Sequence, residues 1–239
     1  MTFLVTIPIY NEEKYVKPVI SEVKKHAEHV LVVNDGSTDA TGRLLDSIDG
    51  IEVITHEGNK GYGASLIDAF AHACRCNHEF VITMDCDAQH EPKQIADFAA
   101  AAPRADIVSG SRYLLPYEPR EAPPEDRRRI NTDVTKIINE ITGYRLTDAF
   151  CGFKAYKLRP LCGLHLTETG YAMPLQLWIH AAKHGLSVLE IPVKMIYGDV
   201  SRGFGNGLDN SAERLKYYME VIERERLAPA VGRCCCRRR

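Results

Sequence analysis

Residues 80–90, FVITMDCDAQH, decide the fold. The first five form an apolar run rich in β-forming side chains, which predicts a buried strand. Asp85, Asp87 and Gln89 follow at alternate positions, so an extended backbone would point all three side chains the same way. Oxygen ligands that converge at a strand end suit Mg²⁺ or Mn²⁺, with a phosphate completing the coordination. The alternative is that Asp87 merely begins a turn before Pro92.

Apolar runs of this kind alternate with helical patterns along the first half of the chain. The other predicted strands are residues 3–9, 30–33, 51–54 and 107–110. This alternation predicts βαβ units and therefore an α/β fold, a mostly parallel sheet flanked by helices. In such sheets ligands bind beyond the carboxyl ends of the strands. We therefore expect Tyr10, Glu12, Asn34 and Asp35 to meet the acidic stretch in one crevice.

The composition is that of an ordinary soluble domain. The chain has 239 residues, of which 45% are hydrophobic and 26% charged, and its formal net charge of −2 gives no basic field for nucleic acid. No apolar run reaches the roughly 18 residues that suggest a membrane span. The N-terminus has no basic region or cleavage site of a signal peptide. We expect a cytoplasmic protein, with Cys74, Cys86, Cys151 and Cys162 reduced and mostly buried.

The second half departs from the alternation. Residues 113–133 are rich in proline and charge and predict a long mobile loop, followed by a helix over 131–141. A helix over 174–184 either packs on the sheet, which we favour, or dips into a membrane interface. A further helix from residue 208 leads into a disordered tail. The run Cys234 to Cys236, flanked by arginines, is typical of a palmitoylated polybasic anchor or is simply disordered.

Six motifs follow one another along the chain: IPIYNE (7–12), VVNDGSTD (32–39), NKGYG (59–63), MDCDAQH (84–90), GSRY (110–113) and DAFCGFKAY (148–156). Taken together, they resemble the family 2 inverting glycosyltransferases of the GT-A fold. The nearest likeness is to the polyprenol-phosphate sugar synthases of the dolichol-phosphate mannose synthase type. The motifs come in the family's order and cover about residues 3–205. The resemblance implies a GT-A, Rossmann-like domain at 1–207, followed by a C-terminal helix and tail at 208–239.

The resemblance also implies a site for a nucleotide-sugar. Asp85, Asp87 and Gln89 would bind the metal, Mg²⁺ or Mn²⁺. The Asp35 loop has the plain alternative of a turn that caps a helix, and both readings can hold. Lys60 either neutralises phosphate or shapes the pocket locally. The implied nucleotide-sugar contacts are Pro8, Tyr10, Glu12, Asp35, Lys60, Asp85 and Cys86.

The acceptor side departs from the family's pattern at one position. Gln176 stands where relatives often carry Glu, and an amide cannot accept a proton. A polyprenyl phosphate is already anionic and needs no base, so we expect that class of acceptor. Arginine suits phosphate binding, although the run Arg127 to Arg129 also reads as a solvated charge cluster. The implied catalytic residues are Asp87, Arg112, Arg129 and Arg202.

The sequence therefore predicts an inverting, metal-dependent transfer of a hexose to a polyprenyl phosphate. The donor would be GDP-mannose, UDP-glucose or UDP-N-acetylglucosamine, and the enzyme could lie at the cytoplasmic membrane face. One alternative is a transferase of the same fold that acts on a saccharide or other hydroxyl. Another is a non-catalytic nucleotide-sugar-binding module, against which the intact Asp85, Asp87 and Gln89 argue.

Overall fold

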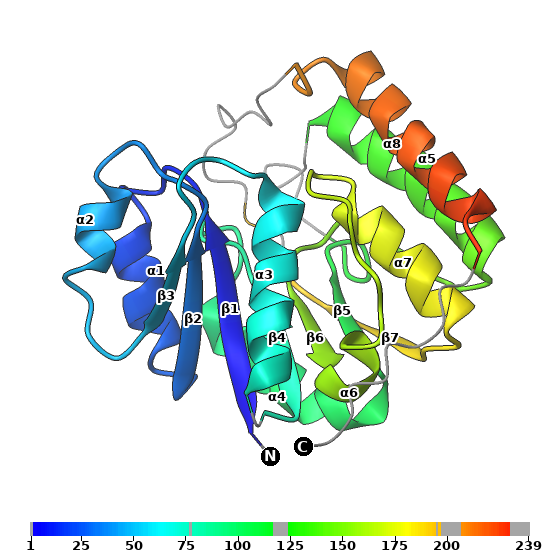
Figure 1. The fold of residues 1–239 in the computed structure, drawn as a ribbon. Helices are drawn as coiled ribbons and strands as arrows, with labels where there is room; N and C mark the ends of the chain where they lie inside the picture. The colour runs from blue at the N-terminus through cyan, green and yellow to red at the C-terminus, as the bar shows by residue number, and fades with distance from the viewer. Residues whose placement is uncertain (1, 77, 117–123, 195, 197–206, 230–239) are drawn as a thin grey trace.

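The computed structural model describes residues 2–76, 78–116, 124–194, 196 and 207–229 (Figure 1). The strands are β1 (Phe3–Ile9), β2 (His29–Asn34), β3 (Glu52–Thr55), β4 (Phe80–Thr83), β5 (Ile107–Ser111), β6 (Lys154–Lys157) and β7 (Val188–Pro192). The α-helices are α1 (Val16–Val23), α2 (Thr41–Leu45), α3 (Tyr62–Arg75), α4 (Ile95–Ala101), α5 (Glu125–Thr142), α6 (Leu158–Leu161), α7 (Met173–Lys183) and α8 (Ser211–Leu227). Two 3₁₀ helices, η1 (Pro92–Gln94) and η2 (Ala102–Arg104), flank α4.

The described strands form one sheet in the order β3-β2-β1-β4-β6-β5-β7. β1 lies between β2 and β4 and is parallel to both, and β7 is parallel to β5 at the far edge. β6 was not predicted; it is inserted between β4 and β5, antiparallel to both. The mostly parallel α/β sheet is therefore confirmed. All the parallel strands end at one edge, which brings together the loops after β1, β2, β4, β5 and β7.

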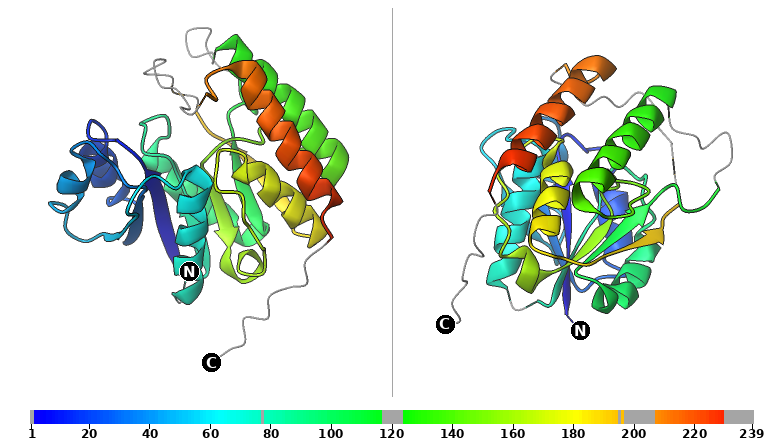
Figure 2. Two further views of the ribbon diagram at one scale, coloured as in Figure 1. Left: turned by 45° about the horizontal axis from the view of Figure 1, so that its top comes forward. Right: turned by 90° about the vertical axis from the view of Figure 1, so that its right-hand side faces the viewer.

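Helices cover both faces of the sheet. The core under α3, α5, α7 and α8 takes Leu4 and Val81 from the strands, whereas the core under α1 and α4 takes the adjacent Val5 and Ile82. This division follows from the two-residue period of a strand. Both views in Figure 2 show α8 running alongside α5. Tyr218, Val221 and Ile222 of α8 belong to the first core, so the C-terminal helix is part of the folded unit.

Helix α7 packs inside the molecule, as favoured above. Trp178 is fully buried, and its indole N–H donates to the Ala149 carbonyl oxygen at 2.9 Å. Met173, Leu175 and Leu177 are also buried. A membrane-interface role for this helix is therefore wrong. Among the described residues, no helix is both long and apolar enough to span a membrane.

The prediction of a loop over residues 113–133 is wrong from Glu125 onward, where α5 begins. Glu125 and Asp126 lie in its first turn, where acidic groups stabilise a helix, and Asp126 accepts from Arg214 of α8 at 2.9 Å. The arginine run at 127–129 is therefore helical. Residues 117–123 and 197–206, and the C-terminal residues with Cys234 to Cys236, lie outside the described residues.

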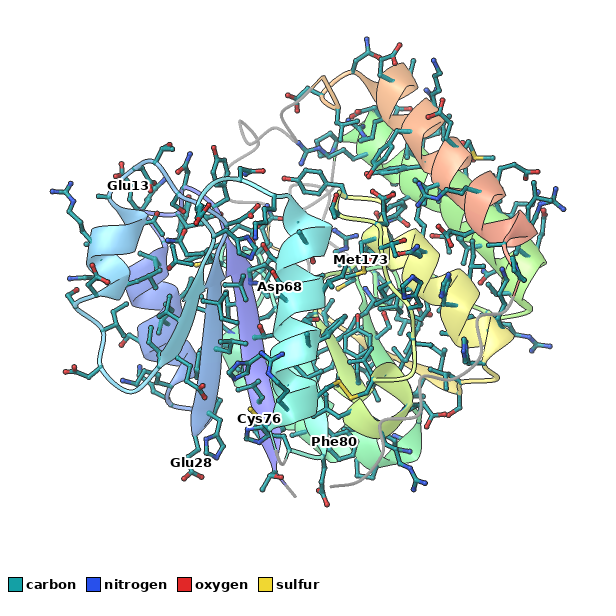
Figure 3. The ribbon with its side chains drawn as sticks, viewed as in Figure 1. Glu13, Glu28, Asp68, Cys76, Phe80 and Met173 are labelled. Carbon is teal, nitrogen blue, oxygen red and sulfur yellow. A yellow bond between two sulfur atoms is a disulfide. The ribbon has the colours of Figure 1, made fainter. Side chains whose placement is uncertain are left out.

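The expectation of four reduced cysteines is wrong for two of them. Cys74 of α3 and Cys162, directly after α6, form a disulfide with their Cα atoms 5.9 Å apart. It is the yellow bond beside α6 in Figure 3. The two residues are 88 positions apart, so their spacing carried no sign of the pairing. Cys86 and Cys151 are buried and form no disulfide, as predicted.

Candidate active site

Polar side chains gather beyond the carboxyl ends of β1, β2 and β4, which are neighbours in the sheet. Tyr10 follows β1 and is 42% exposed, whereas Glu12 is buried and its backbone N–H donates to Thr41 Oγ1 at 2.7 Å. Pro8 lies within β1, paired in register with Val33 of β2. The strand order thus brings the loops after β1, β2 and β4 to the same edge of the sheet.

Asp35 is 3% exposed, and its carboxylate is held by the protein. Oδ1 accepts the backbone N–H of Lys60 and Oδ2 accepts that of Gly61, both at 2.8 Å. Gly61 has φ +105°, a conformation that favours glycine. Asp35 therefore fixes the glycine-rich turn that begins α3. Lys60 takes part through its backbone, and its side chain is exposed.

His56 completes the surroundings of Asp35 and was not identified from the sequence. Its Nδ1 lies 2.7 Å from Asp35 Oδ1, and its Nε2 lies 3.0 Å from Asp68 Oδ2. Asp68 is on α3 and is labelled in Figure 3. The imidazole therefore bridges the loop after β2 and the helix. Asp35 and His56 are 21 positions apart, and His56 and Asp68 are 12 positions apart, so the sequence alone did not indicate that the three side chains meet.

Asp85 lies beyond β4 and is held from two sides. Tyr62, the first residue of α3, donates its hydroxyl to Asp85 Oδ1 at 3.2 Å. Burial, followed by the nearby charge of Asp85, raises the pKa of Tyr62 well above its ordinary value, so the hydroxyl stays a donor. On the other side, a Cβ placed on Gly152 would lie 2.2 Å from Asp85 Oδ2. Only glycine therefore leaves the Asp85 carboxylate where it is.

His90 supports the same carboxylate from behind the strand end. The backbone N–H of Asp85 donates to His90 Nδ1 at 3.2 Å, and Asp85 Oδ2 lies 3.9 Å from that nitrogen. Because Nδ1 accepts this N–H, it carries no proton of its own, and the buried His90 ring fixes the backbone at Asp85.

The extended backbone expected over residues 85–89 is not present. β4 ends at Thr83, and Ala88 has φ +58°, in the left-handed region. The Gln89 backbone N–H turns back to Asp87 Oδ1 at 3.0 Å. The prediction that Asp85, Asp87 and Gln89 point the same way because they alternate along a strand is therefore wrong. Their side chains are partly exposed, while Cys86 between them is buried.

Arg112 follows β5 and is paired with the fully buried Asp148. Its Nε and Nη2 donate to the two carboxylate oxygens at 2.7 and 2.9 Å, a bidentate pair. Although burial favours the neutral acid, the charge of Arg112 holds the pKa of Asp148 well below its ordinary range. The position of the guanidinium is therefore set by Asp148.

The remaining predicted residues are distributed differently. Arg129 is exposed on the first turns of α5, and Arg202 lies outside the described residues. Gln176 is 1% exposed and its amide is used inside the fold. Its oxygen accepts the backbone N–H groups of Thr167 and Glu168, and its nitrogen donates to Glu225 of α8. Gln176 thus connects α7, a loop and α8.

The family match agrees with this arrangement. Residues 4–162 match the model of glycosyl transferase family 2, so the chain belongs to that family and is a glycosyltransferase.

Two relatives and one solved structure are similar to this chain over most of its length. A UDP-N-acetylglucosamine–dolichyl-phosphate N-acetylglucosaminyltransferase of Methanococcus voltae is 28% identical, over 84% of this chain and 88% of its own. A polyprenol monophosphomannose synthase of Mycolicibacterium smegmatis is 30% identical, over 80% and 76%. The glucosyl-3-phosphoglycerate synthase of Mycobacterium tuberculosis, solved with Mn²⁺ and UDP, has 18% identity and a TM-score of 0.73, covering 95% of this chain and 81% of its own. The last likeness concerns the fold, which is the GT-A fold expected from the motifs.

Proposed function

We propose that this protein transfers a sugar from a nucleotide-sugar to the phosphate of a polyprenyl phosphate. The two named relatives act on such acceptors by their names, and they match most of this chain. The observation that carries the proposal is the segment from Asp148 to Gly152. Asp148, at one end, accepts hydrogen bonds from the Arg112 guanidinium, and Gly152, at the other end, lies against the Asp85 carboxylate. This segment supports the proposal because it connects Arg112, a candidate for binding the acceptor phosphate, with Asp85, a candidate for the donor side.

The transfer itself needs no proton. An anionic oxygen of the acceptor phosphate attacks the anomeric carbon and forms the new C–O bond. The bond from that carbon to the diphosphate breaks, its electron pair leaves with the nucleoside diphosphate, and the configuration inverts. Arg112 and Arg129 are candidates to hold the acceptor phosphate. A carboxylate base is unnecessary, which agrees with Gln176 being engaged in the fold.

A divalent cation, Mg²⁺ or Mn²⁺, fits the acidic stretch. In the described part of the chain no three His, Cys, Asp or Glu side chains are grouped to hold an ion by themselves. Asp85 and Asp87 supply two hard oxygen ligands and Gln89 an amide oxygen, a set that donor phosphates would complete. When bound, the ion stabilises the charge that develops on the leaving diphosphate. The Gly152 backbone and the Tyr62 hydroxyl hold Asp85 ready for it.

The donor would bind over β1 and β2. Tyr10 is exposed after β1, and the other candidate contacts are Pro8 near the end of β1 and Glu12, Lys60 and Cys86 in the segments that follow β1, β3 and β4. Asp35 would contribute by shaping the turn at Lys60 and Gly61, because both of its carboxylate oxygens already accept hydrogen bonds from the backbone of that turn. The acceptor belongs to a bilayer, so we place the enzyme at a membrane surface. Leu114 and Leu115, 39% and 59% exposed beside Arg112, would face that surface.

An acceptor panel tests the function. The purified protein is incubated with Mn²⁺, with GDP-mannose, UDP-glucose or UDP-N-acetylglucosamine in turn, and with undecaprenyl phosphate or simple saccharides. We expect one donor to label the lipid phosphate, and Asp87→Ala to reduce this transfer by at least about a hundredfold with an unchanged circular dichroism spectrum. Transfer to saccharides alone would overturn the acceptor, and full activity of Asp87→Ala with chelator present would overturn the metal.

A further inference from the structure

A cavity of about 640 Å³ lies beside the candidate site, between α4 and the ends of β5 and β7. One wall is the face of α4 and η2 that carries Ala100, Ala101 and Arg104. The opposite wall is apolar and is made by residues 191–193. The volume falls in the range of small-molecule sites.

The mouth of this cavity adjoins the donor site. Arg112 lines it, and the Arg112 partner Asp148 is four residues before Gly152, which contacts Asp85. Four residues span at most about 14 Å of extended chain. A phosphate held at Arg112 would therefore lie within a short reach of a sugar whose diphosphate is bound at Asp85.

The lining has two chemical characters. Arg104 and Lys194 bring two cationic groups against the one carboxylate of Asp97, while the charge of Arg112 is balanced by Asp148, so the lining keeps an excess of positive charge and an anionic group is favoured. Leu115 and the 191–193 wall supply apolar surface, which favours a hydrocarbon. A saccharide acceptor would leave that surface without an apolar partner. The ligand that matches both characters is an amphiphile with an anionic head.

We propose that this cavity binds the first isoprene units of the polyprenyl phosphate acceptor, with the phosphate at its Arg112 end. The inference rests on the proposed function and assigns the acceptor chain a place along α4. The free energy of burying a hydrocarbon grows with the apolar area removed from water, so a few isoprene units suffice to dominate acceptor affinity. The cavity would then select for acceptor chain length.

Filling the cavity tests this assignment. Ala100 is exposed on α4, so Ala100→Trp occupies the space without disturbing the core, and Ala96→Trp places the same side chain on the same helix outside the lining. Soluble isopentenyl phosphate and farnesyl phosphate serve as acceptors. We expect Ala100→Trp to raise the KM for farnesyl phosphate about tenfold or more. The KM values for isopentenyl phosphate and for the nucleotide-sugar should stay unchanged, and Ala96→Trp should behave as the wild type.

The outcomes separate the two proposals. Suppose that the wild type uses farnesyl phosphate and that Ala100→Trp prefers farnesyl phosphate to isopentenyl phosphate as strongly as the wild type does. The assignment of the cavity is then wrong, and the proposed function is unaffected. If wild type uses no polyprenyl phosphate, both fall. Should Ala100→Trp not fold, Leu115→Asp is the second variant, since Leu115 is 59% exposed. A carboxylate there should raise the KM for farnesyl phosphate, and an unchanged KM would overturn the assignment.

Discussion

Asp148 is the most heavily bonded carboxylate at the candidate site. It accepts from the backbone and guanidinium of Arg112, the Asn131 amide and the Phe150 backbone N–H. We expect Asp148→Asn to lower the free energy of unfolding by about 2 kcal/mol or more. The variant leaves Arg112 with a weaker partner in a largely buried place. Urea unfolding measures the loss.

The same pair predicts a pH dependence. The pKa of Asp148 is lower in the folded than in the unfolded chain, where it is near 3.8. Its contribution is therefore present above about pH 4 and is lost as the pH falls further. The stability difference between wild type and Asp148→Asn should shrink below pH 4. Asp133→Asn, an exposed change on α5, is the control and should show no such trend. A constant difference down to pH 3 would contradict the assignment.

Gly152 controls the position of Asp85. An added Cβ would lie 2.2 Å from Asp85 Oδ2, and the carboxylate can swing aside. We therefore expect Gly152→Ala to fold with a nearly unchanged Tm and to lose activity by about a hundredfold or more. Gly58→Ala, where a Cβ meets nothing within 4 Å, is the matched control. Wild-type rates in Gly152→Ala would show that the position of Asp85 is irrelevant.

At the residue scale, sequence reasoning found the polar groups at strand ends but not their partners. Asp35 was identified from its motif, but its partner His56 is 21 positions away, and Asp68, the partner of His56, is a further 12 positions along the chain. Pairings of this kind depend on the tertiary fold. Gly152 lay inside a quoted motif, but its reason, the nearness of Asp85, needs coordinates.

At the level of elements, Gln176 links α7 to α8. We expect Gln176→Glu to lower the free energy of unfolding by about 1–3 kcal/mol, because a carboxylate would replace the amide that donates to Glu225. The Gln176→Glu variant should not transfer a sugar to saccharides. The double variant Gln176→Glu, Glu225→Gln returns an amide to the pair and should recover part of the stability. Saccharide transfer by the single variant would mean that position 176 can act as a base.

The elements best predicted were those with a strong period. Buried runs such as residues 3–9 and 107–110 became β1 and β5 within one residue. β6 was missed because its four residues, KAYK, begin and end with lysine and do not look like a buried strand, although Lys154 is in fact buried. The start of α5 was missed because prolines and charges precede it, and acidic first-turn residues were read as loop.

For the molecule as a whole, the Cys74–Cys162 disulfide closes a large loop. Closing it restricts the unfolded chain, so we expect reduction to lower the free energy of unfolding by about 2–4 kcal/mol. A reductant should lower the Tm of wild type but not that of the Cys74→Ser, Cys162→Ser double variant. Cys76→Ser should retain the reductant response. If alkylation without reductant modifies both Cys74 and Cys162 in the native protein, the bond is not formed.

The place of β6 has a consequence for how the chain is made. β4 pairs with β1 on one side and with β6 on the other. In the sequence, however, β5 and α5 come after β4 and before β6, so they are translated before β6 is. The emerging polypeptide therefore carries one open edge of β4 on the ribosome until residues 154–157 leave the exit tunnel. Open strand edges recruit other chains. In the interval before β6 arrives, the nascent chain therefore exposes a strand edge that other chains can pair with.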